Sequence, residues 1–87
     1  MLPAEARWLA RVLTALPESA FPLLNVGSQT LRFRSVDQPY IDSMIFAPLR
    51  RLGRPVLHSD IRVGDGVDVV GDLCDPQFLA RLEHDLG

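Results

Sequence analysis

The chain has 87 residues, with nine basic and eleven acidic side chains and a formal net charge of −2. Its composition, 47% hydrophobic and 23% charged, is typical of a globular chain and excludes a disordered one. A chain of this length forms one domain at most, so we expect a single domain over residues 1–87, which the elements below divide into an N-terminal helix (1–20) and a second part (21–87) and place in the α/β class. Without a basic surface, we expect no binding of nucleic acid.

Cysteine use and hydropathy bear on location. Cys74 is the one cysteine, so an internal disulfide is impossible and a reducing compartment is favoured. The first residues lack a charged region that leads into an apolar run, which predicts no signal peptide. No apolar stretch approaches the roughly 20 residues of a membrane span. These features predict a cytoplasmic protein without a membrane anchor.

Residues 4–16 are predicted to form the first helix. Apolar side chains recur there at i, i+3, i+4 and i+7: Leu9, Val12, Leu13 and Leu16. Pro3 suits the first turn, and Pro17 ends the run. Trp8 either packs in the core or contacts a partner, and the core is the favoured interpretation.

The first strand is predicted at residues 22–26, where Asn25 interrupts a short apolar run. Gly27 then allows a sharp turn and the close approach of a ligand. Two interpretations stand beside each other: a core strand followed by a plain turn, or the mouth of a nucleotide site. Residues 27–39 are expected to form a long polar loop.

Residues 40–52 predict a second helix, with a stripe formed by Ile41, Ile45, Leu49 and Leu52. Pro48 lies inside this pattern and removes a backbone hydrogen bond, so we expect a kink or break near Ala47. Gly53 is predicted to end this helix. Arg50, Arg51 and Arg54 are expected to form a solvated helix end.

Two further strands and a last helix complete the chain. The strands are predicted at residues 55–59 and 67–70. Asp75 can cap the helix that follows, and Pro76 suits its first position. Its apolar stripe consists of Phe78, Leu79, Leu82 and Leu86. Cys74 is expected to lie in a buried loop, and His58 to pack or hydrogen-bond within the sheet. The spacing of the histidines and Cys74 fits no standard zinc pattern.

The order of elements is therefore α–β–α–β–β–α. Nearly thirty residues with a helix separate the first two strands, which favours a parallel right-handed crossover. Only residues 61–66 join the second strand to the third. One solution is a hairpin through Asp65-Gly66. The other is an extended return, because six residues reach about 20 Å and can begin a parallel strand.

Polar side chains follow each predicted strand. Asn25 ends the first strand, Asp60 ends the second, and Asp72 and Asp75 follow the third. If the strands are parallel, these groups meet at one edge of the sheet. A carboxylate after the second strand suits the hydroxyls of a ribose, and one after the third suits an amino donor such as that of adenine.

Three segments resemble motifs of the class I S-adenosylmethionine-dependent methyltransferases. Residues 24–28, Leu-Asn-Val-Gly-Ser, are similar to the first motif of that family. Residues 56–61, Val-Leu-His-Ser-Asp-Ile, resemble its second strand with the ribose-binding acid. Residues 66–75, Gly-Val-Asp-Val-Val-Gly-Asp-Leu-Cys-Asp, resemble its third strand and the adenine-side loop. A compact branch of the family joins these two strands through a short glycine-containing loop, which favours the parallel return.

The resemblance implies a partial Rossmann-like three-layer fold of about three mostly parallel strands, and S-adenosylmethionine as the cofactor. The cofactor-binding residues that it implies are Asn25, Gly27, Ser28, Gln29, Asp60, Ile61, Asp72, Leu73 and Asp75. Asp60 would hold the ribose, and Asp75, with Asp72 as second choice, the adenine. Gln29 and Leu31 stand where the family has glycines, and a side chain at Gln29 either crowds the cofactor or requires a positive φ.

The family domain has about seven strands, and this chain ends after the third strand and its helix. The segments that position a methyl acceptor are absent, so we assign no catalytic residue. The first strand also loses its second neighbour, which predicts a homo-oligomer or a partner chain that completes the sheet there. A competing hypothesis is a non-catalytic interaction or oligomerisation module, and a third is a truncated gene product without a role of its own.

Overall fold

A computed structural model describes residues 1–86 of the chain. Its centre is a three-stranded sheet in the order β1-β2-β3, with β1 at Leu23–Val26, β2 at Val56–Asp60 and β3 at Val69–Val70. Both strand pairs are parallel, and Leu24 of β1 lies opposite Leu57 of β2. The fold is therefore a small α/β fold, and the carboxyl ends of all three strands lie at one edge.

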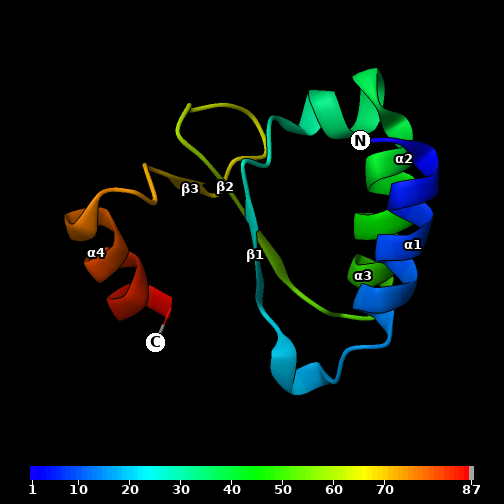
Figure 1. Ribbon diagram of the computed structural model, residues 1–87, viewed down its shortest axis with the longest axis horizontal. Helices are drawn as coiled ribbons and strands as arrows, with labels where there is room; N and C mark the ends of the chain where they lie inside the picture. The colour runs from blue at the N-terminus through cyan, green and yellow to red at the C-terminus, as the bar shows by residue number, and fades with distance from the viewer. Residues whose placement is uncertain (87) are drawn as a thin grey trace.

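Helices α1 (Pro3–Thr14), α2 (Pro39–Ile41) and α3 (Ala47–Arg51) lie side by side, on the right in Figure 1. A single 3₁₀ turn at Glu18–Ala20 leads from α1 towards β1. The buried core lies among these helices and consists of Ala6, Ile41, Ile45, Phe46 and Leu49. Half-buried residues of α1 and Val56 of β2 pack against it, so this core fastens one side of the sheet to the helices.

The expected loop at residues 27–39 is wrong in its second half, which holds a π-helical turn at Phe33–Asp37. Thr30 caps the helical stretch that begins at Leu31 and leads into this turn, because its Oγ1 accepts a hydrogen bond from the N–H of Phe33 at 3.2 Å. The capping hydrogen bond of Thr30 thus stabilises a helical turn in a segment whose polar composition suggested a loop.

The disturbance expected near Ala47 takes the form of a π-helical turn at Asp42–Phe46, between α2 and α3. The N–H of Ala47 donates to the carbonyl of Asp42, five residues earlier. A wide turn of this kind accommodates Pro48, which has no N–H to donate. The predicted stripe is correct for Ile41, Ile45 and Leu49 but wrong for Leu52, which is exposed.

The link between β2 and β3 is the extended parallel return, and the alternative hairpin is wrong. Gly66 has a φ of +75° and turns the chain back. β3 is shorter than predicted because Asp68 adopts a different pairing. Its N–H donates to the carbonyl of His58 at 2.8 Å, whereas its carboxylate accepts the N–H of His58, also at 2.8 Å.

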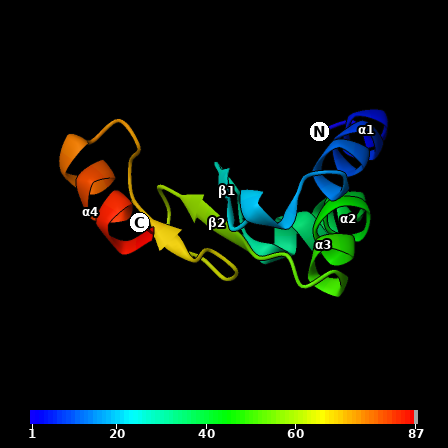
Figure 2. The same ribbon diagram turned by 90° about the horizontal axis from the view of Figure 1, so that it is seen from below.

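Helix α4 (Pro76–Leu86) lies beyond β3, at the opposite end of the molecule from α1, α2 and α3 (Figure 2). Asp75 caps it as predicted, because its Oδ1 accepts the N–H of Gln77 at 3.0 Å. Phe78 is buried against Gly71, where an added Cβ would lie 2.3 Å from the ring. Gly71 therefore provides the flat backbone on which α4 rests.

Two sequence-based expectations about burial are wrong. Trp8 is 59% exposed on α1, because the core side of that helix is centred on Ala6. Cys74 is exposed in the loop before α4. Among residues 1–86, no helix is both long and apolar enough to cross a membrane.

Candidate functional site

A pocket of about 390 Å³ opens at the carboxyl edge of the sheet, where β1, β2 and β3 end. Six of the nine residues expected to bind a cofactor line it: Gly27, Gln29, Asp60, Ile61, Asp72 and Leu73. They come from the last residue of β2 and from the segments that follow the three strands, because the carboxyl ends of parallel strands lie at the same edge. The volume lies within the range of small-molecule sites. We call this the carboxyl-edge pocket.

The other three expected residues have different positions. Asn25 faces the helices, where its Nδ2 lies 3.1 Å from Nδ1 of His58. Ser28 is buried, and its hydroxyl donates to the carbonyl of Gln29 at 2.9 Å. Asp75 serves as the cap of α4. None of the three lines the carboxyl-edge pocket, so Asp72 is the acid that the loop after β3 places there.

Gln29 has a φ of +59°, so the positive φ, one of the two alternatives that its place in the turn left open, is present. The strain is offset by a specific contact, because the N–H of Gln29 donates to Oδ2 of Asp60 at 2.9 Å. Gly27 has a φ of +67° and an open position where a Cβ would touch nothing. The turn after β1 is therefore fastened to the end of β2 through its backbone.

Asp60 accepts a second hydrogen bond from the N–H of Arg62, at 3.2 Å to Oδ1. The N–H of Gln29, followed by that of Arg62, lowers the pKa of the Asp60 carboxyl below its ordinary value. Asp60 is therefore an anion at neutral pH. It is held in place by backbone donors, and its remaining lone pairs are able to accept from a ligand.

The lowered pKa of Asp60 gives a pH dependence with a definite sign. The folded chain binds the Asp60 proton more weakly than the unfolded chain, whose aspartates titrate near about 3.9. The stabilisation from this carboxylate is thus complete above that pH and is lost as the pH falls through the folded pKa of Asp60. Carboxyl-carbon NMR should give a midpoint below that of an aspartate in an unstructured peptide, and the amide signal of Gln29 should follow it. A midpoint at or above the peptide value would contradict these contacts.

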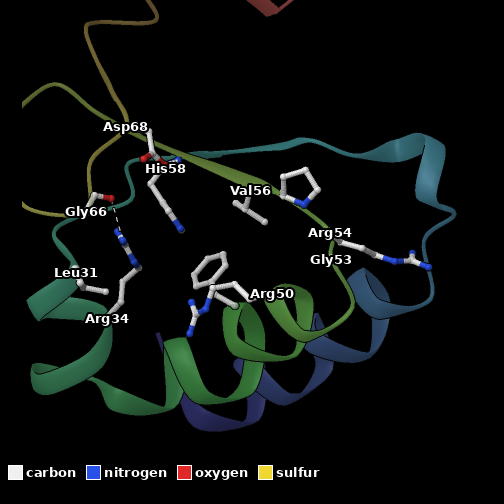
Figure 3. Close-up of a pocket in the computed structure, with 11 residues that line it drawn as sticks. Leu31, Arg34, Arg50, Gly53, Arg54, Val56, His58, Gly66 and Asp68 are labelled. Carbon is white, nitrogen blue, oxygen red and sulfur yellow. Dashed lines mark hydrogen bonds between the residues drawn. The ribbon is translucent and has the colours of Figure 1, made fainter.

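The sequence analysis missed Arg34, whose side chain holds together the segments that follow β1 and β2. Its side chain is 3% exposed and donates to three carbonyls, those of Ser28 at 3.2 Å, Gln29 at 2.8 Å and Gly66 at 3.0 Å. Figure 3 shows the contact with Gly66. Arg34 thereby joins the turn after β1 to the return between β2 and β3. The signal that could have found it is Thr30, a cap residue that places Arg34 on a helical turn.

The structure gives no assembled metal site: within residues 1–86, no three or more His, Cys, Asp and Glu side chains gather in a group that could hold an ion. His58 is half-buried and packs edge-on against Phe46 at 4.7 Å between ring centroids. The expectation that His58 packs and hydrogen-bonds within the sheet is confirmed.

Comparison with known proteins gave no matching family model, no matching curated protein and no matching solved structure.

Proposed function

We propose that the chain is the cofactor-binding half of a methyltransferase-like protein and that its carboxyl-edge pocket binds S-adenosylmethionine or the demethylated product, S-adenosylhomocysteine. The fold would then be a partial Rossmann-like fold. The proposal rests on the resemblance of residues 24–28, 56–61 and 66–75 to the motifs of that family. A reducing, cytoplasmic location belongs to the same proposal.

The observation that supports this function best is the placement of Asp60. Its carboxylate ends β2 beside the glycine turn, and its Oδ2 already holds the N–H of Gln29 at 2.9 Å. A fixed anion at this position suits two neighbouring ribose hydroxyls, because each of its oxygens can accept from one of them. Asp72 lies in the same pocket and would accept from the amino group of an adenine.

The test is calorimetric titration of the folded chain with S-adenosylhomocysteine. We expect a micromolar dissociation constant, which corresponds to about −8 kcal/mol. Asp60→Ala should abolish the binding, whereas Asp85→Ala, which removes an exposed acid from α4, should leave it unchanged. The proposal fails if the folded chain gives no binding heat, or if the two variants behave alike.

Gln29→Gly distinguishes a working site from one that has lost this task. The glycine relieves the positive φ and removes a side chain that lines the pocket. If this change creates or greatly tightens binding that the natural chain lacks, the chain has moved away from cofactor binding.

A second candidate function is an interaction module that works through β1. In the described part of the chain β1 pairs only with β2, and Val26 is 59% exposed beside the open edge. An open edge presents unpaired backbone groups to another strand. We propose a second copy of the chain as the occupant. Light scattering at micromolar concentration should show a dimer that Val26→Lys dissociates and Val36→Lys, an equally exposed position outside the sheet, does not. A monomeric natural chain would refute this candidate.

A further inference from the structure

A second and larger pocket, of about 570 Å³, lies on the side of the sheet that faces α3 (Figure 3). Its apolar wall includes Leu31, Phe46 and Val56, and its polar groups come from α3, β2 and the return that precedes β3. Because it lies between β2 and the helices, we call it the helix-side pocket. It does not share the residues of the carboxyl-edge pocket.

The helix-side pocket is positively charged although the chain as a whole carries a net charge of −2. Three of the nine basic residues line it, Arg34, Arg50 and Arg54. Among the described residues that line it, Asp68 is the one acid, and its carboxylate accepts the N–H of His58. Beside the pocket, Asp42 neutralises Arg50 through contacts of 2.8 and 2.9 Å. With three arginines against Asp42 and Asp68, the side chains in and beside the pocket carry a net charge of +1.

The expectation that Arg54 belongs to a solvated helix end is wrong. Arg54 is half-buried, donates to the carbonyl of Leu16 and lies over the ring of Phe21 at 5.4 Å. These contacts direct its guanidinium towards Leu16 and Phe21, away from Arg34 and Arg50 (Figure 3). Arg54 therefore adds to the positive charge around the pocket but does not reach the side that holds Arg34 and Arg50.

Arg34 is the most deeply buried cation of the group. Its partners are neutral carbonyls, and its buried Nε has no hydrogen-bond partner in residues 1–86. Burial lowers the pKa of this guanidinium, whereas Asp42 and Asp68 act in the opposite direction from a distance. A buried cation without an anionic partner is costly, and a bound anion would offset that cost.

His58 adds a neutral donor. The Nδ2 of Asn25 lies 3.1 Å from its Nδ1, so Nδ1 accepts and the ring proton lies on Nε2. Burial, and then the charge of Arg34, lower the pKa of His58, and the imidazole is therefore neutral at pH 7. Figure 3 shows the ring directed from β2 into the hollow, towards the side of the pocket that holds Arg50.

We propose that the helix-side pocket binds a small organic oxyanion, a phosphate or carboxylate group attached to an apolar body. Arg34, the N–H groups of Arg50 that do not contact Asp42, and the Nε2–H of His58 receive the oxyanion. The apolar body lies along Phe46 and Val56. A guanidinium presents two parallel N–H groups, which match a pair of oxygens in either head group. A pocket of about 570 Å³ has room for an apolar body as well as a head group.

The test is an NMR titration of backbone amides with four probes: phenyl phosphate, benzoate, benzyl alcohol and inorganic phosphate. Phenyl phosphate or benzoate should shift the amides of His58, Gly66 and Asp68 saturably, and the tighter of the two identifies the head group. Benzyl alcohol lacks the charge and inorganic phosphate lacks the apolar body. Each should bind at least about tenfold more weakly, the loss expected when one strong contact is removed.

Two arginine variants locate the binding. Arg50 is exposed enough for Arg50→Gln to preserve the fold, and this change should weaken the tighter probe about tenfold. Arg81→Gln removes the same charge from the exposed face of α4 and should leave the affinity unchanged. The proposal is overturned if neither aromatic anion saturates, if benzyl alcohol or inorganic phosphate binds equally well, or if the two variants weaken binding equally. None of these outcomes depends on whether the carboxyl-edge pocket binds a cofactor.

Discussion

Replacing Arg34 by methionine is expected to lower the free energy of unfolding by about 2–3 kcal/mol, because the loss of its hydrogen bonds outweighs the relief of burying a cation without an anion. Methionine fills similar space but leaves the carbonyls of Ser28, Gln29 and Gly66 without their donor. Carbonyls that lose a buried, charged donor pay the cost of desolvation without compensation. A chain of this length has roughly 5–10 kcal/mol of total stability, so the loss is a large share of it.

Urea unfolding followed by circular dichroism measures this loss, and Arg32→Met provides the matched control. Arg32 precedes Arg34 by two residues but is exposed, and its replacement should change the stability by less than about 0.5 kcal/mol. If the two variants unfold at the same urea concentration, the three contacts of Arg34 do not stabilise the fold. Arg34→Lys, which keeps the charge and loses the planar fork, should fall between the natural chain and Arg34→Met.

The second large effect is expected for Leu49→Ala, which should cost about 2–5 kcal/mol. Leu49 is 0% exposed and lies in the core among Ala6, Ile45 and Phe46. Its truncation leaves a cavity that α1 and the sheet cannot close without moving, because this core fastens the helices to the sheet.

Leu52→Ala is the control for Leu49→Ala, because it deletes the same atoms three residues further along the chain. Leu52 is 56% exposed, and its truncation should cost less than about 0.5 kcal/mol. Thermal unfolding of the two variants compares them directly. Equal losses of stability would mean that α3 packs on the sheet with a different face from the one described here.

The sequence was sufficient to predict the parallel pairing of β1 with β2, because a helix-length connection between two strands favours a parallel crossover. Strand patterns recur at β1 and β2, and a long helical crossover separates them. The alternatives left open for the return to β3 were resolved by its backbone pairing, which no residue pattern encodes. The π-helical turns were beyond prediction, since a stripe of apolar residues specifies a helix but not where it widens.

The candidate site was predictable to a similar depth. Asp60 is the last residue of β2, and Asp72 follows β3 by two residues. The parallel topology alone therefore brings them to the same edge of the sheet. The positions of Asn25 and Asp75 outside the pocket were not predicted, because tertiary packing decides their partners. Asn25 contacts His58 on the neighbouring strand, and Asp75 caps α4. The role of Arg34 was not predicted for a related reason. A buried arginine is recognised by the carbonyls around it, and those come from segments about 6 and 32 residues away.

Because α4 packs on Gly71, amide exchange in this helix should respond to binding in the carboxyl-edge pocket. Among its described side chains α4 buries only Phe78 and Leu82, so it should open to solvent at a lower free-energy cost than the sheet, and its amide hydrogens should exchange sooner. The chain between Gly71 and α4 also forms a wall of the carboxyl-edge pocket. A molecule held there would restrain that wall and slow amide exchange in α4, although the helix itself does not line the pocket.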